Sequence, residues 1–161
     1  MVKLTSLANR VGALLKERQE TIAVSESSSG GLVSAALLSI PGASAYFIGG
    51  GIVYTSRARK VLLDIDFKDH PGVRSSSEPY ALLAANAVRA RLRTDWGLAE
   101  TGAAGPTGNR YGDSSGHTCI AIAGISERVY TLETGSEGRE ENMWKFAETS
   151  LQILQETILA A

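Results

Sequence analysis

Several features that often reveal a protein's function are scarce in this sequence. It contains one cysteine, Cys119, so no disulfide can form within the chain, and its two histidines, His70 and His117, have no partner at zinc-ligand spacing. No apolar run approaches the roughly 18 residues that a membrane helix needs, and residues 1–11 lack the apolar core of a signal peptide. We therefore expect a cytoplasmic location, no membrane partner and no metal site.

Charge and short motifs exclude further classes. Lys and Arg number 16 against 17 Asp and Glu, and the densest basic stretch, residues 57–60, is too short for a nucleic-acid footprint. The G-x-S-x-G elbow, the S-x-x-K motif, the P-loop and the G-x-G-x-x-G fingerprint are all missing. No nucleic-acid partner is therefore expected, and no common catalytic motif assigns a reaction.

The composition fits a single folded domain. With 161 residues, 43% of them hydrophobic and 20% charged, the chain is long enough to bury a core and too apolar to be disordered. No linker, repeat or low-complexity segment divides it. We predict one domain over residues 1–161.

The most informative stretch lies between residues 21 and 40. A short apolar run over 21–24 predicts a buried strand, and after a polar turn, 26–31, apolar residues recur at helical spacing until Pro41. The predicted order is strand, hydroxyl-rich turn and helix N-terminus. Free N–H groups at a helix N-terminus attract anions, so this turn is a candidate site for a phosphate, a carboxylate or an oxyanion.

Simpler functions of the same turn stay open. Ser27 or Ser28 can be an ordinary helix cap. Glu26, at the strand end, is suited to act as a base, to orient an amide or to bind a ribose hydroxyl. It is equally suited to accept hydrogen bonds from the N–H groups of the loop.

Helical and strand-like patterns continue along the rest of the chain. They predict helices over about 3–19, 55–65, 76–96 and 140–161 and strands at about 52–54, 98–101, 117–123 and 128–134, the last two forming a hairpin. In the helix over 55–65 we expect Ala58, Val61, Leu62 and Ile65 to face the core. Because helices and strands alternate before the hairpin, we predict an α/β fold: a single-domain three-layer α/β/α sandwich with a mixed, mostly parallel sheet of about five strands.

Ligands in such folds bind at the carboxyl ends of the strands. The turn at 26–31, the segment after the strand at 52–54 and a second glycine-rich loop, 102–108, all follow strands, so we expect them to converge. The triple glycine at 49–51 indicates a bulge or another backbone nearby.

Individual side chains suggest chemistry, each with an ordinary alternative. Thr101, at a strand end, suits an oxyanion site, and Arg139, before the last helix, suits a phosphate or carboxylate clamp or a salt bridge. Tyr54 is more typical of packing, and Arg59 of a solvated helix face. Ser44 lies in a turn that its hydroxyl would usually just close.

Three segments together carry a family resemblance. ESSSGG at 26–31, PGASAYFIGGGIVYTSRARKVLLDI at 41–65 and ETGAAGPTG at 100–108 follow the order E-S-C-T-G-G, P-G-S-S, G-x-V-x-Y-[ST]-N-x-x-K and T-G-x-A-G-P. In this order and spacing the chain resembles, over essentially its whole length, the C-terminal domain of the competence/damage-inducible protein CinA. That domain also occurs alone as the bacterial nicotinamide mononucleotide deamidase, PncC.

The resemblance implies an amidohydrolase that forms a homo-oligomer and needs no metal or other cofactor. Its small-molecule nucleotide substrate would be nicotinamide mononucleotide, converted to nicotinic acid mononucleotide and ammonia. The family's serine/lysine dyad places the nucleophile on Ser44. The positions that the resemblance implies for catalysis are Ser44, Tyr54, Arg59 and Thr101, and Lys60 is added as a candidate base because it adjoins Arg59. The positions expected to bind the substrate are Glu26, Ser27, Ser29, Gly30, Gly31, Gly102, Gly105 and Arg139.

The sequence departs from the family at this predicted site. The dyad lysine aligns with Arg59, and a guanidinium does not lose its proton in proteins, so Arg59 can stabilise charge but cannot deprotonate Ser44. Lys60 is adjacent, but one residue rotates a helical side chain by about 100°. The Cys and Thr of E-S-C-T-G-G are replaced by Ser28 and Ser29.

Three functions therefore follow as hypotheses. The first is deamidation of nicotinamide mononucleotide, with Ser44 as nucleophile and Lys60 or another group as base. The second is a divergent paralogue that binds a nucleotide or acts on another amide, as the change to Arg59 suggests. The third is an interaction or competence-associated protein with a vestigial cleft.

Overall fold

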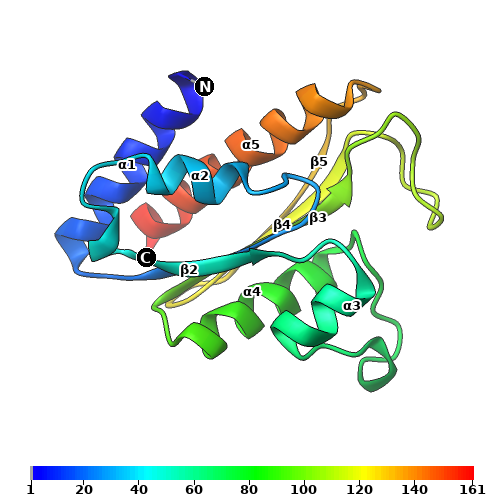
Figure 1. Cartoon of the computed structure of the whole chain (residues 1–161), viewed down its shortest axis with the longest axis horizontal. Coiled ribbons are helices and arrows are strands. Elements are labelled where there is room, and N and C mark those ends of the chain that lie inside the picture. Colours follow the sequence, from blue (N-terminus) through cyan, green and yellow to red (C-terminus); the bar gives the residue numbers. More distant parts are fainter. Residues whose placement is uncertain (1) are drawn as a thin grey trace.

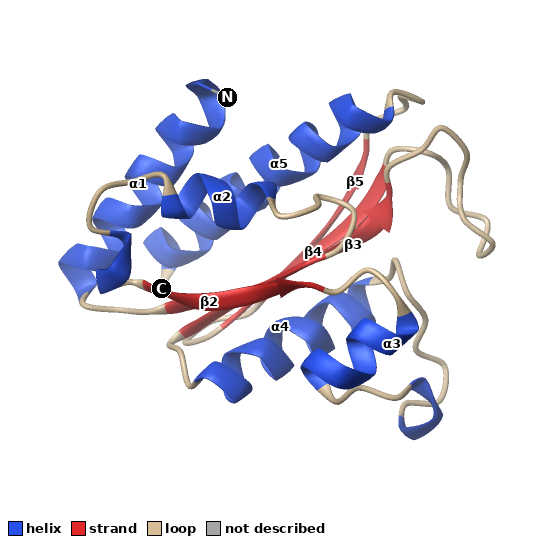
Figure 2. Cartoon of the chain, in the orientation of Figure 1, coloured by secondary structure: helices blue, strands red, loops and turns tan. Residues whose placement is uncertain are grey.

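The computed structural model describes residues 2–161 and shows helices on both sides of one sheet (Figures 1 and 2). The α-helices are α1 (Val2–Arg18), α2 (Leu32–Leu38), α3 (Ser56–Ala58), α4 (Glu78–Leu92) and α5 (Arg139–Ala160). The strands are β1 (Ile22–Glu26), β2 (Phe47–Ile52), β3 (Trp96–Ala103), β4 (His117–Ala123) and β5 (Arg128–Glu133). Short turns of other helix types are η1 (Ala43–Ala45), the π-helical η2 (Arg59–Leu63) and η3 (Phe67–Asp69).

The sheet is mixed, with the strand order β2-β1-β3-β4-β5. β1 lies between β2 and β3 and is parallel to both, whereas β4 is antiparallel to β3 and to β5. Four strands therefore run in one direction and one runs against them, while the pairings divide equally into two parallel and two antiparallel. The predicted α/β sandwich with a mixed sheet of five strands is confirmed.

The two faces of the sheet carry side chains of different size. The face that α1, α2 and α5 cover (Figure 1) is built from large residues, namely Ile22, Val24, Leu98, Ile120 and Ile122. The α4 face is built from Ala23, Ala99, Ala121 and Ala123, which pack against Ala81, Ala84 and Ala85 of that helix. Small residues on both sides let α4 lie close to the sheet. Along residues 2–161, no helix has the length and apolar character needed to cross a bilayer.

β2 lies earlier in the chain than predicted and runs through the triple glycine. We expected a strand at 52–54 because those residues favour strands, but the strand ends at Ile52. Glycine is required here because a Cβ on Gly50 would lie 2.3 Å from the carbonyl oxygen of Val24 in β1. The close backbone expected at the triple glycine is therefore present, and the register of β1 with β2 also shifts by one residue at Ile48, just before the glycines.

The helical segment after β2 presents the predicted face only in part: Ala58 packs against the core, whereas Val61 and Leu62 do not. Its second half is a π turn, which is wider than an α-helical turn and displaces the side chains that follow. Ile65 is buried as expected and so is Leu63, but Val61 is 67% exposed and Leu62 is 45% exposed. α4 also ends at Leu92, before the predicted end near residue 96.

Gly50→Ala is predicted to destabilise the protein by about 2 kcal/mol or more, because backbone cannot move away from the added methyl as a side chain can. Gly49→Ala is the matched control, since its Cβ would meet only a Leu92 methyl at 3.3 Å. Urea unfolding of both variants measures the difference. Equal free energies of unfolding would contradict the close approach of β1 and β2.

Candidate functional site

A polar cleft of about 280 Å³ lies at the carboxyl ends of β1, β2 and β3. The turns after these strands form part of its wall, and the segment before α4 forms the rest. Its lining residues are Ser27, Val53, Tyr54, Thr55, Ser56, Arg59, Ser75, Ser76, Tyr80, Thr101 and Gly102. Five residues singled out from the sequence therefore meet here: Ser27, Tyr54, Arg59, Thr101 and Gly102.

Glu100 of β3 holds the turn that follows β1. Its carboxylate, 2% exposed, accepts from the N–H groups of Ser27 (3.1 Å) and Ser29 (2.8 Å) and from the hydroxyls of Ser28, Ser29 and Thr118. Such a set of donors offsets the cost of burying a carboxylate. The sequence analysis missed Glu100, although an acidic residue within an apolar strand is a signal for buried donors nearby.

Glu26 occupies the N-terminus of α2 with its own carboxylate. It accepts from the N–H groups of Gly31 (3.2 Å), Val33 (2.9 Å) and Ser34 (2.9 Å), and from the hydroxyl of Ser34 (2.7 Å). The helix end does bind an anion, as the sequence predicts, but this anion is the side-chain carboxylate of Glu26 and not an external ligand. Of the functions considered for Glu26, the structure places it as the acceptor for the loop N–H groups.

These bonds leave one serine hydroxyl of the turn facing the cleft. The hydroxyls of Ser28 and Ser29 are buried and donate to carboxylates, whereas the half-buried Ser27 has no hydrogen-bond partner for its hydroxyl among residues 2–161. Gly30 and Gly31 adopt positive φ angles of 67° and 97°, which shape the turn, and neither of them lines the cleft. Ser27 is thus a half-buried serine whose backbone is held by Glu100 and whose hydroxyl has no partner among residues 2–161.

Arg59 is a fixed cation in the cleft wall, not a solvated residue. Its guanidinium carbon lies 3.5 Å from the ring centroid of Phe67 and 5.9 Å from that of Tyr80, and its Nε donates to the carbonyl of Ile65 (3.4 Å). No carboxylate in the described part of the chain forms an ion pair with it. Burial raises the pKa of Tyr80 to about 12, so this neighbour stays neutral and leaves the charge of Arg59 available to a ligand.

Arg139 lies at the rim and joins two walls of the cleft. Its Nη1 donates to the carbonyl of Gly105 (2.6 Å), in the loop after β3, and its Nη2 donates to the hydroxyl of Tyr54 (3.0 Å). Arg139 therefore connects the start of α5 to the segments after β2 and β3. Neither of the two expected partners, an external anion or a carboxylate, is needed to hold it there.

Two of the predicted catalytic residues lie outside the cleft. Ser44 is exposed in η1, at the amino end of β2, whereas the cleft is at the carboxyl end; six strand residues at about 3.3 Å each separate the two by about 20 Å. The side chain of Lys60 is 53% exposed and pairs with Asp64 at 3.2 Å. The one-residue rotation from Arg59 directs Lys60 away from the site.

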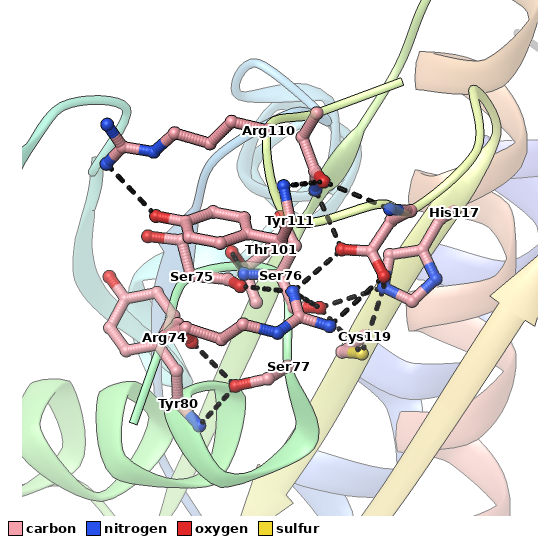
Figure 3. A network of polar contacts seen from close by, with 12 residues as sticks. Arg74, Ser75, Ser76, Ser77, Tyr80, Thr101, Arg110, Tyr111, His117 and Cys119 are labelled. Carbon is pink, nitrogen blue, oxygen red and sulfur yellow. Dashed lines mark hydrogen bonds and ion pairs between the residues drawn. The ribbon is translucent and has the colours of Figure 1, made fainter. Parts of the chain in front are cut away.

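The loop before α4 supplies cleft residues that the sequence analysis missed (Figure 3). Ser75 and Ser76 line the cleft, and the N–H of Ser76 donates to the Thr101 hydroxyl at 3.1 Å. Arg74 holds this loop through two hydrogen bonds to Asp113, at 2.7 and 3.1 Å, and these bonds lower the pKa of the Asp113 carboxyl. The run of serines signals a helix cap, and nothing in the local pattern shows that it packs against Thr101.

The fold and the cleft define an α/β protein whose hydroxyl-rich cleft lies at the carboxyl edge of a mixed sheet. Among residues 2–161, no group of three His, Cys, Asp or Glu side chains is arranged to hold a metal ion. The sequence profile of the CinA C-terminal domain matches residues 4–158. The chain belongs to the CinA C-terminal domain family.

Relatives in the sequence comparison support this assignment. A CinA-like protein of Trichodesmium erythraeum is 39% identical over 139 residues, which is 86% of this chain and 33% of the relative. A putative competence-damage inducible protein of Halothermothrix orenii is 36% identical over 151 residues, which is 93% of this chain and 37% of the relative. The chain thus spans about a third of the length of these relatives.

Solved structures share the whole fold. The competence/damage inducible protein CihA of Agrobacterium tumefaciens superposes with a TM-score of 0.89 at 26% identity, covering 98% of this chain and 96% of that one. A CinA superfamily protein of Klebsiella pneumoniae gives a TM-score of 0.92 at 19% identity, with coverage of 98% and 99%. The second likeness bears on the fold alone.

Glu100→Gln is predicted to lower the free energy of unfolding by about 1–3 kcal/mol, because the amide nitrogen cannot accept and leaves a buried donor unpaired. Hydrogen exchange at the amides of Ser27 and Ser29 should quicken as the turn loosens. Glu137→Gln, at an exposed position, is the matched control. Unchanged protection of both amides would show that Glu100 does not hold the turn.

Proposed function

We propose that the cleft binds a mononucleotide that carries an amide, of the nicotinamide mononucleotide type. The supporting observation is its lining, in which eight residues carry hydroxyl groups and one carries a guanidinium. Hydroxyls suit a ribose and an amide, and a guanidinium suits a phosphate. The volume of about 280 Å³ is near the lower end of the range for small-molecule pockets. Membership of the CinA C-terminal domain family also supports this proposal.

Ser27 replaces Ser44 as the serine proposed to face the amide. It lines the cleft together with Arg59, which stands at the position of the family's dyad lysine, and its hydroxyl is not committed to another group. Its backbone is held by Glu100, so the hydroxyl is presented from a fixed turn. Ser44, about 20 Å away along β2, cannot act on a ligand in the same cleft.

Hydrolysis would also need a group that accepts the serine proton. The residues lining the cleft include no carboxylate, imidazole or amine, and Arg59 does not deprotonate. We therefore propose that this chain binds the nucleotide with little or no turnover. Deamidation by Ser27 is the second candidate, which its uncommitted hydroxyl favours.

Arg59→Ala is predicted to weaken the binding of nicotinamide mononucleotide at least tenfold, because a charge-assisted hydrogen bond to phosphate contributes about 1.5–3 kcal/mol. Isothermal titration calorimetry measures the dissociation constant. Lys60→Ala removes a positive charge from the neighbouring residue outside the cleft and should leave binding within about twofold of wild type. If both variants bind as wild type does, the phosphate is not held by Arg59.

Arg59→Lys is predicted to raise ammonia release from nicotinamide mononucleotide at least tenfold above wild type, because a desolvated lysine can accept the Ser27 proton. Adding Ser27→Ala should abolish the gain, and adding Ser44→Ala should preserve it. Wild-type turnover that depends on Ser27 would instead support deamidation by this chain. Turnover that depends on Ser44 would contradict the assignment of the cleft.

The quaternary structure and the location of the protein are separate points. The family resemblance predicts a homo-oligomer, and the single cysteine favours a cytoplasmic location. Both stay predictions.

A further inference from the structure

His117 is a buried titratable residue that the proposed function does not use. It begins β4 and is 6% exposed, and Figure 3 shows its ring beside Ser76 and Cys119. Nε2 lies 2.8 Å from the carbonyl oxygen of Ser76, and Nδ1 pairs with the carboxylate of Glu133 on β5. The imidazole therefore connects the far edge of the sheet to the loop that lines the cleft.

The two partners of the ring favour its charged form. A carbonyl oxygen can only accept, so Nε2 carries a hydrogen, and an ionised carboxylate also only accepts, so Nδ1 satisfies it by carrying a second one. Burial alone would lower the pKa of His117, but the bonds to Glu133 and Ser76 and the nearby charge of Asp113 outweigh burial and raise it above its ordinary value. The imidazolium satisfies both acceptors at once.

The backbone carbonyl and the backbone N–H of Ser76 both form hydrogen bonds. Its carbonyl accepts from His117 and its N–H donates to the hydroxyl of Thr101, which lines the cleft. Ser76 also has a φ of 55°, a left-handed conformation that a serine rarely adopts unless its surroundings impose it. The Ser76 carbonyl also accepts from Nη1 of Arg74 (3.4 Å) and from the Cys119 thiol (3.6 Å), so His117 supplies the shortest of several bonds to that carbonyl, while Thr101 holds the N–H.

We propose that His117 is a positioning residue: its charged form holds the Ser76 carbonyl and so fixes the wall of the cleft formed by Ser75 and Ser76 against Thr101. How firmly this wall is held then depends on the protonation of His117, because only the charged ring donates to Ser76 and Glu133 at once. This inference concerns the wall itself and does not require that the proposed ligand be correct.

The other charged and titratable groups around the ring do not change this expectation. Asp113 lies 3.8 Å from Nε2 and stays ionised because Arg74 lowers its pKa, and Arg74 itself stays charged. On β4 the thiol of Cys119 lies 3.6 Å from Nε2, and burial raises its pKa, so it stays neutral.

Glu78 of α4 is more remote and acts through Thr131, whose hydroxyl donates to it and contacts the Cys119 thiol. Together with Glu133, these groups complete the set that faces the ring. Imidazole is the group of the set that ordinarily titrates near neutral pH.

The sign of the pH dependence follows from the raised pKa of His117. The stabilisation by the charged ring is complete below the pKa of an unfolded histidine, about 6.5, and is lost as the pH rises through the higher pKa of the folded state. Above that pH, Nδ1 no longer donates to Glu133. The side chain of Glu133, which is 56% exposed, can then turn to water. The ring of His117 is then no longer held by Glu133 while it donates to the Ser76 carbonyl.

A titration by nuclear magnetic resonance between about pH 5.5 and 8.5 tests the proposal without any ligand. The amide signals of Ser76 and Thr101 are expected to shift with the same midpoint as the His117 ring. Glu133→Gln should lower that midpoint, because the carboxylate charge is removed. The second histidine gives the matched control, and His70→Gln should leave the midpoint unchanged.

His117→Gln separates position from charge, since a glutamine amide can donate to the Ser76 carbonyl but does not titrate. The variant should keep the Ser76 amide near its low-pH position at every pH. A flat Ser76 signal while His117 titrates in wild type would overturn the proposal, and so would a midpoint that follows His70. If His117→Gln does not fold, Glu133→Gln still tests the proposal, because the midpoint of the Ser76 and Thr101 amide signals should move with that of the His117 ring.

Ligand binding provides a second measurement that rests on the proposed function. The dissociation constant of nicotinamide mononucleotide is expected to rise several-fold between pH 6 and 8.5 in wild type, relative to its value in His117→Gln at the same pH. The comparison with His117→Gln removes any pH effect that comes from ionisation of the ligand itself. If the nucleotide binds at no pH, the proposed function fails while the amide titration still tests His117. Equal pH dependence in both proteins would count against the positioning role.

Discussion

Two buried carboxylates, those of Glu26 and Glu100, fix the turn after β1 and so determine which groups this turn presents to the cleft. Together they bind the N–H groups of Ser27, Ser29, Gly31 and the first residues of α2, so the turn after β1 cannot rearrange without leaving a buried charge unpaired. The same bonds use up the backbone donors that would otherwise attract an anion. The turn after β1 therefore offers a ligand side chains and few free N–H groups, and the cleft adds further hydroxyls and the guanidinium of Arg59.

Much of the fold could be predicted because the periodic patterns were strong. The first and last helices, the hairpin and the convergence of strand ends at the carboxyl edge all follow from local spacing and from the rule that such edges bind ligands. β2 could not be placed, because its glycines disfavour a strand locally and are required only by the approach of Val24. The low strand propensity of glycine is outweighed here by the need for close contact with β1.

The misplaced start of β2 also explains why Ser44 was expected near the strand ends that form the cleft. A strand that began at residue 52 would leave a long loop before it, and a loop of that length could carry Ser44 to either edge of the sheet. A strand that begins at Phe47 instead fixes Ser44 at the amino edge. The turn serine Ser27 had the less distinctive pattern, yet its neighbours bind carboxylates and its own hydroxyl is left facing the cleft. The contacts of Ser76 with Thr101 and His117, 25 and 41 residues away in sequence, leave no local signal at all.

The central claim is that ligand binding occurs at the carboxyl edge, beside Ser27, and not at the amino edge, beside Ser44. The most direct measurement is to map the amide signals that shift when nicotinamide mononucleotide is added to the ¹⁵N-labelled protein. The largest shifts are expected on Ser27, Thr55, Ser76 and Thr101, with Ser44 unchanged. Shifts centred on Ala43–Ala45 would contradict it.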